Sequence, residues 1–191
     1  MKQAMSLVRP GALLALALSS QAMAGTTNLD VTFTATLRET TCDMTIEGGT
    51  GDGQSNTIQI GTAGKTSLGD IINGVDTVTA PFKLKITECP TSIAAIKTTV
   101  AGIASTDMPT AINNASTTGP AAYIGVTIAR ASAPTSIFTP NSAEDSKRLV
   151  WTQAEINAKE VALLARLVQT KSGSATTGDF SALATFNFTY E

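Results

Sequence analysis

The clearest pattern in the chain is an alternation of apolar and polar residues near its C-terminus. Between Gly178 and Glu191 apolar residues recur at every second position, which is the period of a strand with one buried face. These positions are Phe180, Ala182, Ala184, Phe186, Phe188 and Tyr190. Three of the six phenylalanines lie on this face, although aromatic residues make up only 5% of the chain. The pattern predicts a central strand against which the hydrophobic core closes.

Two further alternations stand out. One lies near the N-terminus, and its apolar positions are Leu29, Val31, Phe33, Ala35 and Leu37. The other runs from Phe82 to Ile86 and leads to Cys89, after which Pro90 removes a backbone donor and ends the strand. Shorter strand signals occur at 57–60 and 122–129.

The stretches between these signals are predicted to be loops. Residues 104–121 and 131–148 are rich in Ser, Thr, Asn, Pro and Ala, and they carry no recognisable set of functional residues. The glycine-dense stretch 48–56 invites comparison with a phosphate-binding loop. It lacks the Gly-Lys-Ser/Thr ending and leads into a strand rather than a helix, so a loop between strands is expected.

Residues 1–24 have the features of a secretory signal. Lys2 and Arg9 are its only charges, a short apolar run covers 11–18, and Ala22-Met23-Ala24 offers a cleavage site. The run is too short to span a bilayer, so we expect an exported mature chain; the alternative is an uncleaved anchor. The chain has a net charge of −2 and no cluster of basic residues, which argues against nucleic acid or anionic lipid as a partner.

The two cysteines are expected to form one disulfide in an exported chain. Cys42 and Cys89 have no C-x-x-C spacing, and the chain has no histidine, so the rival interpretation of free or metal-binding thiols has little support. We expect no metal and no cofactor. Without histidine there is no Ser-His or Cys-His pair, and the carboxylates are scattered, so we also expect no enzyme activity and no catalytic residues. Trp151 is interpreted as a core or rim residue rather than a sugar platform.

The C-terminal pattern resembles the signature of fimbrial (pilus) subunits of the chaperone–usher pathway. The resemblance rests on Gly178, Ala182, the run Ala184-Thr185-Phe186 and the penultimate Tyr190. A generic amphipathic last strand is the alternative. The strand that carries the second cysteine also matches, and so does Ala165-Arg166 except for a missing aromatic residue. Where the family usually has a glycine seven residues before the first cysteine, this chain has Ala35.

The resemblance resolves an ambiguous stretch at 154–168, which is full of strong helix formers. Propensity alone predicts a helix. The family instead has a strand here, so we expect a turn or one helical turn near 152–157 and then a buried strand over about 161–169.

The resemblance implies an all-β fold, an incomplete immunoglobulin-like β-sandwich that lacks its last strand and has one disulfide. It divides the chain into a signal peptide (1–24), an N-terminal donor-strand extension (25–40) and a pilin domain (41–191). Leu29, Val31, Phe33, Ala35 and Leu37 would be donated to a neighbour. The strand from Gly178 through Phe180, Ala182, Ala184, Phe186, Phe188 and Tyr190 to Glu191 would border the receiving groove and meet the chaperone.

The implied function is that of a structural subunit of an adhesive fimbria, closest in style to minor or adaptor subunits. Its implied partners are a periplasmic chaperone, an outer-membrane usher and neighbouring subunits, and its location is the cell surface, reached through the periplasm. Two alternatives are a receptor-binding tip adhesin and a free-standing secreted immunoglobulin-like binding module. The first usually has a separate lectin domain, for which the mature chain has no room. The second requires a complete sandwich of its own.

Overall fold

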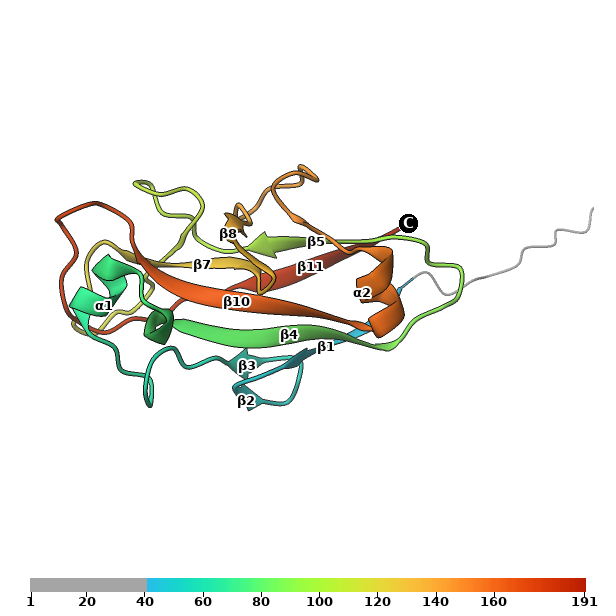
Figure 1. Cartoon of the computed structure of the whole chain (residues 1–191), viewed down its shortest axis with the longest axis horizontal. Coiled ribbons are helices and arrows are strands. Elements are labelled where there is room, and N and C mark those ends of the chain that lie inside the picture. The colour runs from blue at the N-terminus through green and yellow to red at the C-terminus, as the bar shows by residue number, and fades with distance from the viewer. Residues whose placement is uncertain (1–40) are drawn as a thin grey trace, which may run out of the picture. The chain divides into compact units, whose positions relative to one another are not determined.

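The computed structural model describes residues 41–191, and these form two main antiparallel sheets and a separate two-stranded β2-β3 pair, with short helices at the ends of the sheets (Figure 1). The strands are β1 (Asp43–Glu47), β2 (Thr50–Gly51), β3 (Asn56–Thr57), β4 (Thr79–Glu88), β5 (Ile96–Ala101), β6 (Ile112–Asn113), β7 (Ile124–Arg130), β8 (Ala133–Ile137), β9 (Leu149–Val150), β10 (Glu160–Gln169) and β11 (Thr185–Tyr190). The helices are α1 (Leu68–Asn73), α2 (Gln153–Ala158) and the 3₁₀ turn η1 (Asp76–Val78).

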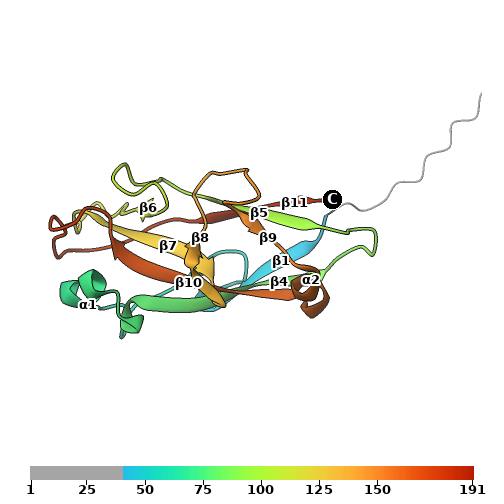
Figure 2. The same cartoon turned by 45° about the horizontal axis from the view of Figure 1, so that its top comes forward.

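The larger sheet has the order β1-β4-β10-β7-β6, with β8 also paired to β7, and the smaller sheet has the order β11-β5-β9. Figure 2 shows β5, β9 and β11 as a layer apart from β4, β10 and β7. The inward residues of β4, β5 and β10 alternate with more exposed ones, as expected for strands with one face against a core. Side chains that are at most 2% exposed include Leu84, Ile96, Leu149, Val161 and Leu163.

The expected disulfide forms between Cys42 and Cys89, directly before β1 and directly after β4. It closes a loop with a sequence separation of 47, which corresponds to about 4 kcal/mol of stabilisation on the chain-entropy estimate. Because β1 and β4 pair along their length, the disulfide fixes one end of a ladder that is already hydrogen-bonded. The predictions of an all-β chain and of one disulfide are confirmed.

The ambiguous stretch is divided as expected, into one short helix (α2) followed by a buried strand (β10). The helix starts at Thr152 with a capping box, in which the Thr152 side chain and the Glu155 side chain each bond to the other residue's backbone amide. It ends at Lys159, which has φ of +57°, a left-handed conformation that stops the helix. Trp151 lies in the core, 4% exposed, and donates to Thr98 Oγ1 at 3.0 Å.

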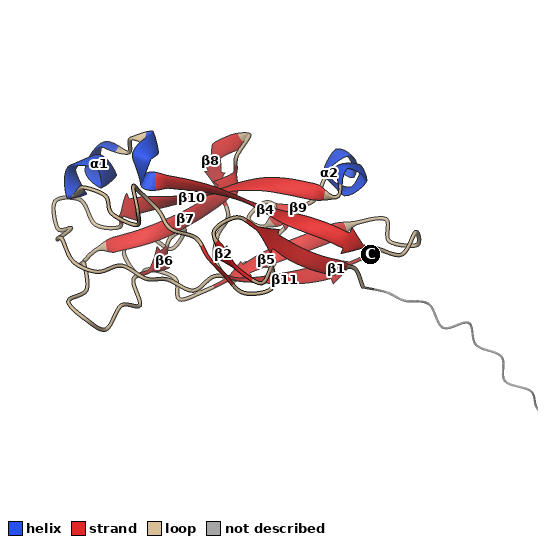
Figure 3. Cartoon of the chain, turned by 90° about the horizontal axis from the view of Figure 1, so that it is seen from below, coloured by secondary structure: helices blue, strands red, loops and turns tan. Residues whose placement is uncertain are grey.

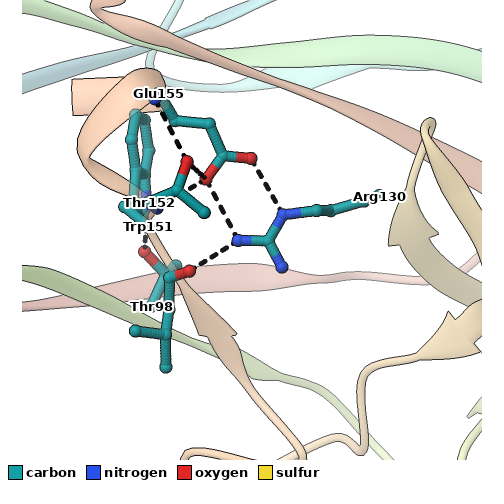
Figure 4. Close-up of polar contacts among 6 residues, drawn as sticks. Thr98, Arg130, Trp151, Thr152 and Glu155 are labelled. Atoms are coloured by element: carbon teal, nitrogen blue, oxygen red, sulfur yellow. Dashed lines mark hydrogen bonds and ion pairs between the residues drawn. The ribbon is translucent and has the colours of Figure 1, made fainter. Parts of the chain in front are cut away.

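Arg130 of β7 ties α2 to the sheet (Figure 4). Its guanidinium donates to both carboxylate oxygens of Glu155 at 2.8 and 3.1 Å, and to the carbonyl of Val150 at 2.5 Å. Burial would by itself raise the pKa of the Glu155 carboxyl, but the bonds from Arg130 and from the Thr152 amide outweigh it. The pKa of Glu155 therefore lies below its ordinary value.

Several local predictions are wrong. The last strand begins only at Thr185, and β11 lies at the edge of its sheet rather than in the centre. The strand signal at 57–60 is a strand only as far as Thr57. The predicted loops 104–121 and 131–148 contain β6 and β8, which both pair with β7. The first two differences have one cause, because both segments face a gap between the sheets where the described residues supply no pairing strand. The N-terminal alternation and the proposed signal lie outside the described residues.

Candidate functional site

A groove with a volume of about 940 Å³ and an apolar floor runs alongside the stretch that leads into β11, residues 176–186, and we call it the β11 groove. Its floor comes from β4, β7 and β10 of the larger sheet and from the loop before β7, and it consists of Phe82, Ala121, Ile124, Val126, Ile128, Ala165 and Leu167. One wall is the C-terminal stretch, through Gly178, Phe180, Ala182, Ala184 and Phe186. The opposite wall is formed by residues 55–60 and 64–66, and Leu68 and Ile71 of α1 also line the groove. In Figure 3 the segments that link β3 to α1 and β10 to β11 are drawn mainly as loops, in tan.

The wall at the C-terminal stretch has an unpaired backbone edge. β11 pairs with β5 from Thr185↔Ala101 to Tyr190↔Ile96, and among residues 41–191 it has no second partner strand. Upstream of β11, residues 182–184 make no backbone hydrogen bond to another described residue. A strand edge of this kind presents amides and carbonyls that can pair with another strand.

The opposite wall is also unpaired. Ile58 and Ile60 are half-buried and Gln59 is exposed, so the alternation of a strand persists beyond β3. Within the described part of the chain, residues 58–60 form no backbone hydrogen bond. The groove therefore has an apolar floor and a free backbone edge on each side. This is the arrangement that an added β-strand satisfies, since its amides complete the sheet and its alternate side chains fill the floor.

The residues predicted to border the groove fall into two groups, because those up to Phe186 line it and the last two do not. Phe180, Ala182, Ala184, Phe186, Phe188 and Tyr190 are all half-buried, and each is flanked by exposed residues. The Phe186 ring packs against Phe82 with centroids 5.8 Å apart, so the groove is filled at this end by the protein's own rings. Phe188 stacks on Tyr190, and neither of them lines the groove.

The end of β11 is anchored to the start of β1. Tyr190 Oη donates to the Cys42 carbonyl at 3.1 Å, which places the point where the N-terminal segment leaves the domain beside the end of β11. Burial raises the pKa of the Tyr190 hydroxyl, and the nearby Asp43 charge adds to the rise. The Glu191 side chain pairs with Lys97 at 2.7 Å, and its main-chain oxygen accepts from the amides of Ala94 and Ala95.

Gly178 closes the other end of the wall, and here glycine is required. It has φ of +152°, and a Cβ at this position would lie 2.5 Å from both the Ala121 nitrogen and the Gly119 oxygen. The chain passes this closely because Asp179 exchanges backbone hydrogen bonds with Gly119 and Ala121. A side chain at 178 would separate the C-terminal stretch from the loop that forms this end of the groove.

The alternation at the C-terminus did not reveal the floor of the groove, which comes from β7 and β10, or the wall at 58–66. Arg166 is a further residue whose role emerges only in the fold. Its guanidinium donates to the Gly74 carbonyl at 2.6 Å, and this bond holds the end of α1 against β10. The apolar alternation of Ile58 and Ile60 was a usable signal for the wall, because it marks an extended segment with one buried face.

Comparisons with known proteins agree with this geometry. Residues 31–191 match the family model described as "Fimbrial protein". The chain belongs to the fimbrial protein family. It is 35% identical over 175 residues to the "Uncharacterized fimbrial-like protein YadM" of Escherichia coli (strain K12), a match that covers 86% of this chain and 88% of the relative.

The fold agrees with the same assignment. The crystal structure of the P pilus rod subunit PapA is similar with a TM-score of 0.53 and 17% sequence identity, over 85% of this chain and all of that one. The described residues thus have the immunoglobulin-like pilin fold, and the chain is a pilus subunit. The family and the fold are structural rather than enzymatic. None of the helices among residues 41–191 is long and apolar enough to cross a membrane.

Proposed function

We propose that this fimbrial subunit is polymerised by donor-strand exchange, after a periplasmic chaperone has delivered it to an outer-membrane usher. The observation that carries the proposal is the β11 groove, whose apolar floor lies between two unpaired backbone edges. A strand bound there satisfies both edges and covers the floor at once. The extension 25–40, with its five alternating apolar positions, is the segment proposed to enter a neighbour's groove.

The chaperone follows from the same geometry. An open groove exposes apolar surface beside free strand edges, which is a combination that promotes aggregation. A subunit in transit therefore needs a temporary strand in the groove. The chaperone supplies that strand, and the usher is where the next subunit's extension replaces it. The finished fibre places the subunit at the cell surface.

Two substitutions separate the two parts of this proposal. Phe186→Arg puts a charge into the groove beside Phe82, so it should abolish recovery of the chaperone complex as well as incorporation into fibres. Phe33→Arg changes only the donated segment, where a large side chain contributes about 1.5–3 kcal/mol of burial. It should block incorporation and leave the chaperone complex intact.

The experiment is co-expression with the matching chaperone and usher, followed by recovery of the periplasmic complex and of shed fibres. Asn187→Arg is the matched control, because Asn187 lies on β11 next to Phe186 but is exposed and does not line the groove. It should give both products at the level of the unchanged chain. Loss of the chaperone complex with Phe33→Arg would contradict the proposal, since it would make the extension part of the subunit's own fold.

A further inference from the structure

We propose that the glycine-rich hairpin 48–57, which contains β2 and β3, closes the outer edge of β1 and so directs an added strand to the β11 groove. We call this hairpin the β1 cover. The inference rests on the proposed function, because a subunit that receives a strand in one groove needs its other sheet edges closed. It identifies Gln54 and Asn56 as residues that determine where a strand adds.

The edge in question belongs to β1, the end strand of the larger sheet. β1 pairs with β4 on one side, and among residues 41–191 no strand of this sheet lies on its other side. Alternate residues of an antiparallel pair direct their amide and carbonyl away from the partner strand. The Ile46 amide donates away from β4, so Ile46 and Met44 are the outward residues of β1. Left free, their backbone groups would accept a strand from another molecule.

The β1 cover bonds to these outward groups (Figure 1). The Ile46 amide donates to the Gly53 carbonyl at 2.6 Å. The side-chain amide of Gln54 donates to the Met44 carbonyl at 2.7 Å. A carboxamide has the same donor and acceptor groups as a peptide bond, so the Gln54 side chain takes the place of the backbone of an added strand.

Asn56 makes the largest number of these contacts. Its side-chain nitrogen donates to the Ile46 carbonyl at 3.2 Å and to the Gly48 carbonyl at 2.8 Å. Its side-chain oxygen accepts from the Gly53 amide at 2.8 Å. Asn56 therefore bonds to β1, to the residue that follows β1 and to the turn of the cover. Without this side chain the cover keeps little hold on the edge.

The glycine-dense sequence allows the cover to fold this tightly. Gly51 lies opposite Asn56 in the β2-β3 pair, and a Cβ at Gly51 would collide with the Ser55 carbonyl oxygen and with the Asn56 side chain. Asp52 shapes the turn, because its carboxylate accepts from the amides of Gln54 and Ser55 at 2.9 and 2.7 Å. The stretch that resembles a phosphate-binding loop in composition thus places two side-chain amides against a strand edge.

Charges on β1 also oppose the pairing of two copies. Asp43 and Glu47 are exposed at the two ends of β1. An antiparallel pair of β1 strands centred on Thr45 would bring Asp43 of one copy opposite Glu47 of the other, and like charges in that position are destabilising. Asp43→Lys removes this repulsion and faces Glu88 of β4, so it isolates the effect of the cover.

Hydrogen exchange tests the cover in the chaperone complex of the mature chain. We compare the unchanged chain with Gln54→Ala/Asn56→Ala and measure the exchange rate of the Ile46 amide. We expect this rate to rise at least about tenfold in the double variant, because the cover then detaches from the edge. The amides of Thr45 and Glu47, which face β4, are the internal reference and should keep their rates. Equal Ile46 rates in the two proteins would overturn the inference.

The assembly state of the complex tests what the cover prevents. In the Asp43→Lys background, size-exclusion chromatography with light scattering should give one subunit and one chaperone per particle. Adding Gln54→Ala and Asn56→Ala should give a dimer of such complexes. Gln153→Ala with Asn187→Ala is the matched control, because it removes the same two side-chain types at exposed positions of α2 and β11. A dimer with Asp43→Lys alone, or no dimer without the cover, would contradict the inference.

A steric change opens the cover by a second route. Gly51→Ala displaces the Asn56 side chain without removing it, so it should also speed the exchange of the Ile46 amide. Gly173→Ala is its control, since a Cβ there meets no atom within 4 Å. If both cover variants behave like the unchanged chain in its chaperone complex, this inference fails while the proposed function stands. If the unchanged chain forms no chaperone complex, the proposed function fails.

Discussion

At the scale of single residues, Glu155 has two structural roles. It completes the capping box of α2 and it binds Arg130 of β7 through both carboxylate oxygens. The ion pair with Arg130 needs the ionised carboxylate, and the ionised form also strengthens the bond that the Thr152 amide donates. Because the pKa of Glu155 is lower in the folded protein than its ordinary value of 4.5, its stabilising contribution is present above that pH. The contribution is lost as the pH falls below it.

Glu155→Gln should therefore lower the free energy of unfolding at pH 7 by about 2 kcal/mol, because the Arg130 guanidinium loses its charged partner. The loss should shrink as the pH falls through the lowered pKa of Glu155, because the native carboxyl is then protonated as well. Urea unfolding of the chaperone-free domain at several pH values measures this. Glu144→Gln is the control, since Glu144 pairs with Lys147 at an exposed site. An equal loss for both variants at pH 7 would contradict the assignment.

Gly178 supports a second prediction at this scale. Gly178→Ala places a Cβ against the backbone of Gly119 and Ala121, at a φ that side chains rarely adopt, so it should cost about 1–3 kcal/mol of stability. Gly173→Ala is the matched control. Gly173 also has a positive φ, but a Cβ there meets no atom within 4 Å. Thermal unfolding of both variants separates the effect of the close backbone contact from the effect of the positive φ. Similar losses of stability in the two variants would rule out the close contact as the cause.

At the scale of elements, the sequence predicts strands well where each has a partner. The alternation from Phe82 to Ile86 became β4, and a buried strand did follow a single helical turn in the ambiguous stretch. The strand prediction fails where a segment has no pairing strand among the described residues. Residues 58–60 and 180–184 alternate like strands, yet they carry no ladder, because alternation reports a buried face and not a hydrogen-bonded neighbour. The floor of the groove was not predictable, since it depends on which strands lie side by side.

The break between α2 and β10 depends on one residue. The sequence 154–168 has the propensity to continue as a helix, and Lys159 stops it in a left-handed conformation. A non-glycine residue is strained there, so Lys159→Gly should raise the free energy of unfolding by about 0.5–1 kcal/mol. Asn157→Gly, inside α2, should lower it by about the same amount. Denaturant midpoints of the two variants should move in opposite directions, and a lower midpoint for Lys159→Gly would show that the side chain matters more than the strain.

At the scale of the whole molecule, the start of the described domain lies beside the end of β11, where Tyr190 bonds to Cys42, whereas Gly178 closes the far end of the groove. In the proposed function, residues 25–40 precede Cys42 and bind the groove of a neighbour. Under this proposal each subunit binds one neighbour through its groove and another through its extension. This head-to-tail arrangement has no internal closure, so it gives an open fibre.

The arrangement predicts that two assembly-deficient variants complement each other once. Deletion of residues 25–40 leaves the groove and removes the donor, whereas Ala182→Phe keeps the donor and blocks the groove. Neither variant alone should form fibres, because each lacks one of the two contacts. Mixed in equal amounts, they should give a one-to-one dimer that does not grow, which size-exclusion chromatography with light scattering measures. Longer oligomers in the mixture would mean that the filled groove still accepts a donor, and the absence of a dimer would mean that the extension of this chain is not the strand its groove accepts.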